Sequence, residues 1–217
     1  KFEVGLKLNY YKDLTSKNNY GVNFSINQSI GNYQYVKFSY LFMPDIFLRE
    51  YSDQDQIYQY LNEEQGVDFL SNKAYYNYSK TSLKYESPYL KNNSKLVIGL
   101  NFENQFYNKF FTEFDLNITG LTISYLGDIS ITYAYSIATN STKNDISVST
   151  FRMDRGYFEN VFKCSKEFKL SDKFKIGSSF NMIERKYTSG HFSDELHFNR
   201  KHLDKTLSIW IKFKIYK

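Results

Sequence analysis

Hydrophobic and polar residues alternate along most of this chain. In the first ten residues, Phe2, Val4 and Leu6 share one parity, while Glu3 and Lys7 share the other. The same alternation recurs at residues 22–26, 36–42, 96–102, 129–137, 174–182 and 207–215. A period of two places alternate side chains on opposite faces of a β-strand, and no helical stripe competes with it. The pattern therefore predicts an all-β protein.

Turn signals divide the chain into about ten strands. Tight hairpin turns are expected at Gly31-Asn32, Gly127-Asp128 and Ser171-Asp172-Lys173. Longer connections are expected at residues 13–19, 44–73, 104–111, 138–156 and 187–195. An antiparallel up-and-down order follows, with both ends of the chain on the side of the short turns. Residues 74–86 and 157–170 are weakly patterned, so eight or twelve strands are the alternatives to ten.

Two local departures from the alternation carry expectations of their own. The apolar phase changes between Ile118 and Leu121, which predicts a β-bulge at Thr119-Gly120. Within the longest connection, Ser52 and Gly66 are suited to begin and end a short helix over residues 52–65. We expect that helix to be a solvated part of the loop, with folding over the barrel mouth as the alternative.

The two faces of the predicted strands differ in residue size. The face opposite the large apolar residues is rich in small ones: Gly5, Ser25, Ser39, Gly99, Ser130, Thr132, Ala134, Ser136, Gly177, Ser179 and Ser208. A soluble barrel turns its apolar face inward, whereas a membrane barrel turns it toward lipid. Because glycine weakens a solvent-exposed sheet face, small residues fit better in a narrow interior. The pattern favours a transmembrane β-barrel over a soluble β-protein.

Composition narrows the choice further. Of the 217 residues, 19% are aromatic, yet the mean hydropathy is −0.55. This aromatic content excludes a disordered chain, and the absence of any run of 18 apolar residues excludes a membrane-spanning helix. The net charge of +5 comes from scattered lysines rather than from a basic face, so no nucleic-acid partner is expected. We interpret residues 1–217 as one barrel domain, either mature or part of a longer precursor.

Aromatic residues gather near the predicted strand ends. Rings at these positions are typical of the aromatic girdles that flank the apolar belt of membrane barrels. The residues concerned are Tyr10, Tyr11, Tyr20, Tyr33, Tyr35, Tyr40, Phe42, Tyr75, Tyr76, Tyr78, Phe102, Tyr125 and Tyr216.

The final segment reads Leu-Ser-Ile-Trp-Ile-Lys-Phe-Lys-Ile-Tyr-Lys, from Leu207 to Lys217. It resembles the last strand of bacterial outer-membrane β-barrel proteins, whose commonest form ends on Phe or Trp, whereas here Lys217 follows Tyr216. The resemblance is to the class and to no single family. It implies a bacterial outer-membrane location, short periplasmic turns and long extracellular loops. It also implies contact with lipid and lipopolysaccharide, and handling by the barrel-assembly machinery, with other outer-membrane proteins as further candidate partners and no cofactor.

The predicted interior carries more lysines than acids. The candidate lumen-lining residues are Glu3, Lys7, Lys37, Lys95, Glu103, Asp115, Lys175 and Lys212. An open barrel with this lining would favour anions. A closed barrel filled by salt bridges is the expected alternative, because barrels of about eight strands are filled by side chains.

One cluster resembles a catalytic element. His191 and Ser193 lie two residues apart, as in the His-x-Ser element of outer-membrane phospholipases and lipid A deacylases. The resemblance implies His191 as base, Ser193 as nucleophile and Glu195 or Asp194 as the group that orients the histidine. The phospholipase pattern continues with Asn-Gly, whereas Asp194-Glu195 follow here. We therefore expect a polar loop at this point, and no metal site is predicted from the three histidines.

The leading functional hypothesis is non-enzymatic. It is a scaffold or surface interaction component of an outer-membrane complex, with residues 44–73 and 138–156 as contact loops. A narrow anion-leaning pore and a lipid hydrolase that uses His191 and Ser193 are the alternatives.

Overall fold

The computed structural model describes residues 1–10, 12, 18–50, 73–90, 93–108, 115–140, 155–171, 173–188 and 199–213. These residues form ten β-strands and no α-helix. The strands are β1 (Phe2–Asn9), β2 (Asn19–Gly31), β3 (Gln34–Glu50), β4 (Lys73–Glu86), β5 (Lys95–Tyr107), β6 (Leu116–Leu126), β7 (Ile129–Asn140), β8 (Tyr157–Lys169), β9 (Phe174–Tyr187) and β10 (Lys201–Phe213). The helix expected over residues 52–65 lies outside the described residues.

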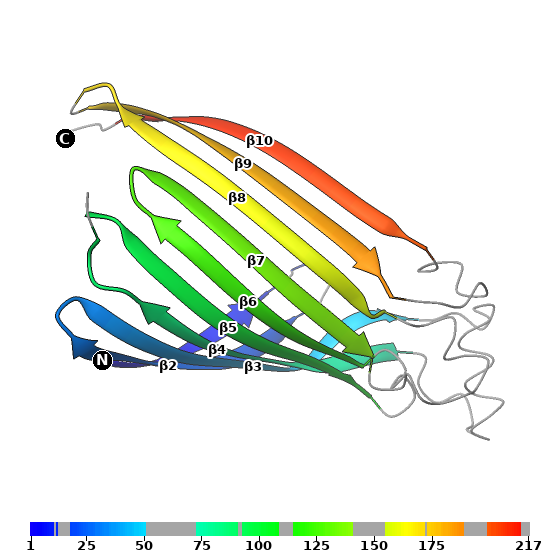
Figure 1. Ribbon diagram of the computed structural model, residues 1–217. Helices are drawn as coiled ribbons and strands as arrows, with labels where there is room; N and C mark the ends of the chain where they lie inside the picture. Colours follow the sequence, from blue (N-terminus) through cyan, green and yellow to red (C-terminus); the bar gives the residue numbers. More distant parts are fainter. Residues whose placement is uncertain are drawn as a thin grey trace, which may run out of the picture.

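All ten strands belong to one antiparallel sheet in which each strand pairs with its sequence neighbours. The sheet is strongly curved, with the short hairpins and both ends of the chain on one side (Figure 1). The prediction of ten up-and-down strands is confirmed, including the weakly patterned β4 and β8. Strands β1 and β10 are the two edges of the sheet, and no pairing joins them within the described residues.

The alternation keeps one phase around the whole sheet. Starting from Phe2, the residues directly opposite one another on successive strands are Ile26, Phe38, Leu83, Leu100, Leu121, Tyr135, Asn160, Glu184 and Leu203. We call the face that carries this row the outer face and the opposite face the inner face. A slip of one residue at any pair would exchange the two faces, so the register is tightly specified.

The expected bulge at Thr119-Gly120 is wrong. The pairing of β6 with β5 and with β7 runs through these residues without a shift. The phase changes because Leu116 and Ile118 turn inward, where Leu116 packs with Ala138 and Tyr157 in a small buried cluster. An apolar core on the inner face, and not an extra residue, explains the pattern.

Strand β3 extends further than the sequence predicted. Residues 44–50 were expected in the long connection, yet they pair with β4 across two register shifts, between Met43 and Ile46 and between Phe47 and Arg49. Asp45, directly after Pro44, has a φ of 51°. Proline and a left-handed residue break the alternation, so the pattern did not predict that the strand continues. The connection expected to start at residue 104 likewise begins only after Tyr107.

Small residues on the inner face make room for large neighbours across the sheet. Trp210 lies directly opposite Gly177, and a Cβ added at Gly177 would collide with the indole ring. The Trp210 indole therefore covers the backbone at Gly177, a packing that aromatic residues often supply across from a strand glycine.

Candidate functional site

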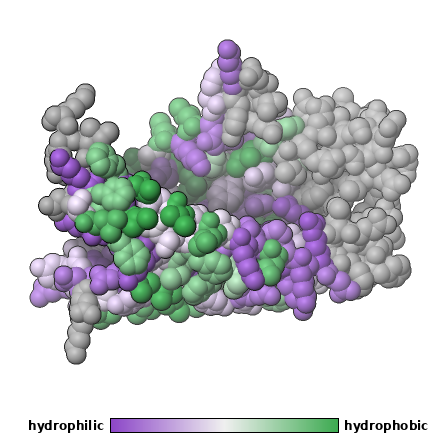
Figure 2. Space-filling view, turned by 90° about the horizontal axis from the view of Figure 1, so that it is seen from above, coloured by the Kyte–Doolittle hydropathy of each residue, from purple (hydrophilic) through white to green (hydrophobic). Residues whose placement is uncertain are grey.

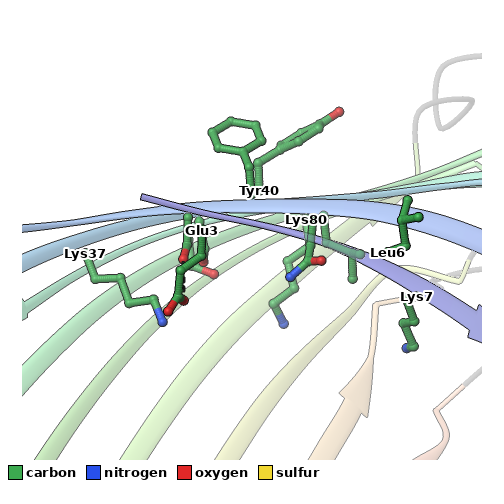
Figure 3. Close-up of a pocket in the computed structure, with 12 residues that line it drawn as sticks. Glu3, Leu6, Lys7, Lys37, Tyr40 and Lys80 are labelled. Carbon is green, nitrogen blue, oxygen red and sulfur yellow. Dashed lines mark hydrogen bonds between the residues drawn. The ribbon is translucent and has the colours of Figure 1, made fainter. Parts of the chain in front are cut away.

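The inner face carries most of the polar and charged side chains of the sheet. Its basic residues within the described strands are Lys7, Lys37, Lys80, Lys84, Lys95, Lys163, Lys169, Lys175, Arg185 and Lys212, and its acidic residues are Glu3, Glu86, Glu103, Glu159, Glu167 and Asp204. Glu3, Lys37 and Lys80 point to the concave side of the sheet, whereas Tyr40 points away from it (Figure 3). Bases outnumber acids on this face.

The sequence-derived candidates fall almost entirely on this face. Every one of them that belongs to a strand lies on the inner face: Glu3, Lys7, Lys37, Lys95, Glu103, Lys175 and Lys212. Asp115 differs, because it precedes β6 and its Oδ1 accepts a hydrogen bond from the backbone N–H of Tyr107 at 2.6 Å. Burial raises the pKa of the Asp115 carboxyl, and this hydrogen bond opposes the rise. Asp115 thus ties the end of β5 to the start of β6.

Aromatic and arginine side chains pack together at the long-loop end of the inner face. We call this group the Tyr–Arg layer; its members are Tyr76, Tyr107, Arg155, Tyr157, Arg185 and Tyr187. The rings of Tyr76 and Tyr107 stack at 5.0 Å between centroids. The Arg155 Nη1 donates to the Tyr107 hydroxyl at 3.0 Å, which joins the start of β8 to the end of β5.

The second half of the Tyr–Arg layer is centred on Arg185. Its guanidinium lies 4.1 Å from the centroid of the Tyr157 ring. Its Nε and Nη2 both donate to Glu159 Oε2, at 2.9 and 2.6 Å. Tyr157 also contacts Tyr187 edge to face. A planar, permanently charged guanidinium suits this combination of ring stacking and carboxylate pairing.

Two rings of the Tyr–Arg layer are buried although the face that carries them is polar. Tyr107 is only 7% exposed and Tyr157 8%, and Leu116 beside Tyr157 is 3% exposed. Nearby, Tyr78 donates to Glu103 at 2.8 Å, and Lys80 forms an ion pair with the same carboxylate. Side chains thus cover the inner face at the long-loop end of β4–β9, beside an open pocket of about 200 Å³ that Glu103, Tyr157 and Glu159 help to line.

The short-turn end of the inner face is more open and more basic. Glu167 forms ion pairs with both Lys175 at 2.8 Å and Lys212 at 2.5 Å. One carboxylate therefore neutralises part of the charge of two lysines from neighbouring strands. Lys95 lies over the ring of Tyr89 at 4.6 Å and pairs with Glu86 at 3.6 Å. These lysines stay partly exposed to solvent.

A cavity of about 510 Å³ lies on the inner face of β1–β4. Glu3, Lys7, Lys37, Lys80 and the hydroxyls of Ser25, Ser39 and Ser82 are among its lining groups (Figure 3). The small serines leave the space, and the lysines give it a positive potential.

The Tyr–Arg layer was missed by sequence reasoning, and part of the expected aromatic girdle is wrong. Tyr35, Tyr76 and Tyr78 lie on the inner face, where Tyr35 contacts Lys95 and Tyr78 contacts Glu103. On each strand these tyrosines are an even number of residues from an inner-face lysine. The sequence therefore already indicated that they share the inner face. Tyr20, Phe102 and Tyr125 do lie on the outer face.

The candidate catalytic residues cannot be placed in this site. His191, Ser193 and Glu195, with Asp194, lie outside the described residues. His202 lies on the inner face of β10, directly opposite Arg185. The described ranges contain no group of three His, Cys, Asp or Glu residues that could hold a metal ion. They also contain no helix long and apolar enough to cross a membrane.

Comparison of the chain with protein families, with characterised proteins and with solved structures finds no match in any of the three.

The ion pair within the Tyr–Arg layer should contribute measurably to stability. In a double-mutant cycle with Glu159→Gln and Arg185→Gln, we expect a coupling energy of about 1–3 kcal/mol, because Glu159 is largely shielded from solvent. Urea unfolding in mild detergent, followed by circular dichroism, measures it. The matched control is the exposed Lys1–Glu3 pair, where Lys1→Gln and Glu3→Gln should show no measurable coupling. Equal coupling in both cycles would contradict a structural role for the layer.

Proposed function

We propose that this chain is an integral β-barrel protein of a bacterial outer membrane that acts as a scaffold or surface interaction protein. The outer face is proposed to contact lipid, the inner face to form the barrel interior, and the long connections to reach the extracellular side. Lipid and lipopolysaccharide are then its immediate surroundings, and other outer-membrane proteins are its candidate partners.

The observation that carries this proposal is the apolar outer face. Leu6 is 79% exposed, Leu207 70% and Ile131 40%, and apolar residues gather on the visible surface between hydrophilic residues at either end (Figure 2). A soluble barrel would bury such residues and expose the lysines, which is the reverse arrangement. Monomeric soluble proteins rarely leave an apolar surface of this extent uncovered. Lipid is the surrounding that matches it.

Strand length and connection pattern support the same proposal. Nine of the strands have 11 to 17 residues, and a tilted membrane-spanning strand needs about 9–11. An even number of strands, with short turns on one side and longer connections on the other, is typical of bacterial outer-membrane barrels.

A membrane barrel requires that β1 and β10 pair, because lipid offers no hydrogen bonds to a free sheet edge. These two strands run antiparallel, and their outer faces carry residues of matching phase. Closure also requires a stagger between the first and last strands. In the open sheet Phe2 lies in the same row as Leu203. If closure instead places Phe2 opposite Phe213, all of β1 pairs with Thr206–Phe213 of β10.

This register is chemically complementary. On the outer face it places the apolar residues of β1 opposite Leu207, Ile209, Ile211 and Phe213. On the inner face it places Glu3 opposite Lys212, and Gly5 opposite Trp210. Lys201 and Lys205, the outer-face lysines of β10, remain beyond the paired segment. A register in which Phe2 lies opposite Ile211 instead of Phe213 would bring Lys205 opposite Leu8.

A scaffold role is favoured over an open pore by the packing of the interior. The Tyr–Arg layer covers the long-loop end of the inner face, where Tyr107 and Tyr157 are buried. Ten strands enclose an interior only slightly wider than the eight-stranded barrels that side chains fill. The proposed contact surface is therefore the outside of the molecule and its longer connections.

A charge on the outer face should oppose membrane insertion. We expect Leu207→Arg to destabilise the inserted protein by about 2–4 kcal/mol, because Leu207 lies midway along β10 on the proposed lipid face. The neighbouring inner-face change Thr206→Arg is the matched control and should cost much less. Urea titration of protein folded into phosphatidylcholine vesicles measures both. In a soluble protein a leucine that is 70% exposed would tolerate arginine, so equal stabilities would refute the lipid-facing assignment.

The seam should form a specific disulfide. In a Cys164→Ser background, Val4→Cys with Ile211→Cys, and separately Lys7→Cys with Ser208→Cys, are directly opposite in the proposed register. One pair lies on each face, so the two together sample both spacings of an antiparallel ladder. We expect an intramolecular disulfide in at least one pair after mild oxidation, seen as a shift on a non-reducing gel.

Mismatched pairs provide the control for the seam. Val4→Cys with Ile209→Cys or with Phe213→Cys should cross-link much less efficiently. A mismatched pair that reacts better would exclude the proposed register. Disulfide-linked dimers would instead show that the edges pair between copies, which contradicts closure within one chain.

The scaffold proposal also predicts electrical behaviour. Purified protein inserted in planar lipid bilayers should show no stable conductance steps, because the Tyr–Arg layer occupies the interior. Removing bulk from that layer with Tyr107→Ala and Tyr157→Ala should create or widen a water path. Stable channels from the unchanged protein would favour the narrow anion-leaning pore instead.

A further inference from the structure

The cavity on the inner face of β1–β4 has lysines that lack acids of their own. Lys37 lies directly opposite Lys84 across β3 and β4. The nearby acids are already engaged, since Glu3 pairs with Lys1 at 2.5 Å, Glu86 with Lys95, and Glu103 with Lys80. Within the described residues, Lys7, Lys37 and Lys84 form no ion pair.

Two like charges directly opposite on one sheet face destabilise the pairing of their strands. Glu3 lies close enough to interact with Lys37 electrostatically, but its shortest contact is with Lys1. An anion in the cavity beside Lys37 would lower the cost of the Lys37–Lys84 pair. The arrangement therefore favours a negatively charged ligand over an empty cavity.

The remaining lining groups indicate what else the ligand carries. Ser25 and Ser39 present hydroxyls from adjacent strands, and Asn23 adds an amide; the Ser25 hydroxyl donates to Glu3 Oε2 at 3.4 Å, and Ser82 lies buried at the base. Hydroxyls both donate and accept hydrogen bonds, which suits the hydroxyls of a ligand. A volume of about 510 Å³ lies in the range of small organic-molecule sites and far exceeds the space that a bare inorganic anion needs.

We propose that this cavity binds a small, hydroxyl-rich organic phosphate of the sugar-phosphate class. The phosphate lies near the ammonium groups of Lys7 and Lys37, with Lys84 adding to the positive potential beside the cavity. The sugar hydroxyls bind the serines and Asn23. Because lysine attracts phosphate mainly as a point charge, several lysines around one group are needed for selectivity.

The site rests on the proposed function in one respect, because the barrel interior is what shields these lysines from bulk solvent and strengthens their field. The ligand would enter from the short-turn side, since the Tyr–Arg layer fills the opposite end of the interior.

Isothermal titration calorimetry on the full chain, folded in mild detergent at low ionic strength, tests this site. The probes are glucose 6-phosphate, glucose and inorganic phosphate. We expect glucose 6-phosphate to bind and the other two to bind at least about tenfold more weakly. Lys37→Gln should weaken binding of glucose 6-phosphate by about tenfold or more, as expected for loss of one hydrogen bond to a charged group.

The matched control is Lys205→Gln, which removes the same charge from the outer face of β10. It should change the affinity less than twofold. Equal losses from Lys37→Gln and Lys205→Gln would show that net charge attracts the ligand, and would overturn the site. Undetectable binding, or equal binding of inorganic phosphate or of glucose, would overturn the proposed ligand class.

Vesicle insertion measured on the same samples separates the two proposals. Insertion without binding of glucose 6-phosphate rejects the site and leaves the membrane barrel standing. Binding without insertion rejects the membrane barrel and shows that the cavity acts on its own. Far-ultraviolet circular dichroism of Lys37→Gln, compared with the unchanged protein, excludes loss of fold as the cause of weaker binding.

Discussion

The constraint on which this structure depends is the constant phase of its side chains across ten strands. Each strand has only two faces, so every pairing must match outer residues with outer residues. The register does so from Phe2 on β1 to Leu203 on β10. Everything else, including the apolar surface, the basic inner face and the proposed closure of the edges, requires that the pairing keeps this phase apart from the register shifts near the end of β3.

Within that frame the inner face divides into two regions with different physics. At the long-loop end, large rings and arginines pack together and hold Glu159 in a partly shielded ion pair. Toward the short turns, serines and glycines leave space between lysines that acids only partly balance. The first region stabilises the sheet, since partly buried charges are costly to separate from their partners. The second region retains an excess of positive charge, which only a group from outside these strands would neutralise.

The proposed seam connects these regions to the outer surface. Edge strands with long apolar faces tend to pair with strands of other chains, and natural proteins cover or pair such edges. Pairing β1 with β10 would protect the exposed residues of both strands and bring Glu3 to Lys212. The same closure would enclose the cavity beside β1 and so increase the effect of its lysines. The two proposals, membrane insertion and anion binding, would therefore be linked through one strand pair.

Much of this architecture could be read from the sequence because alternation is a local property. Parity alone assigned Lys37, Lys95 and Glu103 to one face, and turn residues such as Gly127-Asp128 separated the strands. The alternation gave the wrong face where apolar residues pack against each other on the otherwise polar inner face. Leu116 and Ile118 face inward because they meet Ala138 and Tyr157 from other strands, and this imitated a bulge.

Contacts between distant strands could not be predicted at all. Nothing local brings Arg155 to Tyr107, Arg185 to Tyr157, or Lys37 to Lys84, because each pairing depends on the register of intervening strands. Pro44 and Asp45 likewise concealed the end of β3 until its pairing with β4 was known. The sequence by itself determined the face of most strand residues, but not of Leu116, Ile118 or the inner-face tyrosines. Only the tertiary structure decided which residues meet there, because meeting requires the relative position of strands that sequence periodicity does not encode.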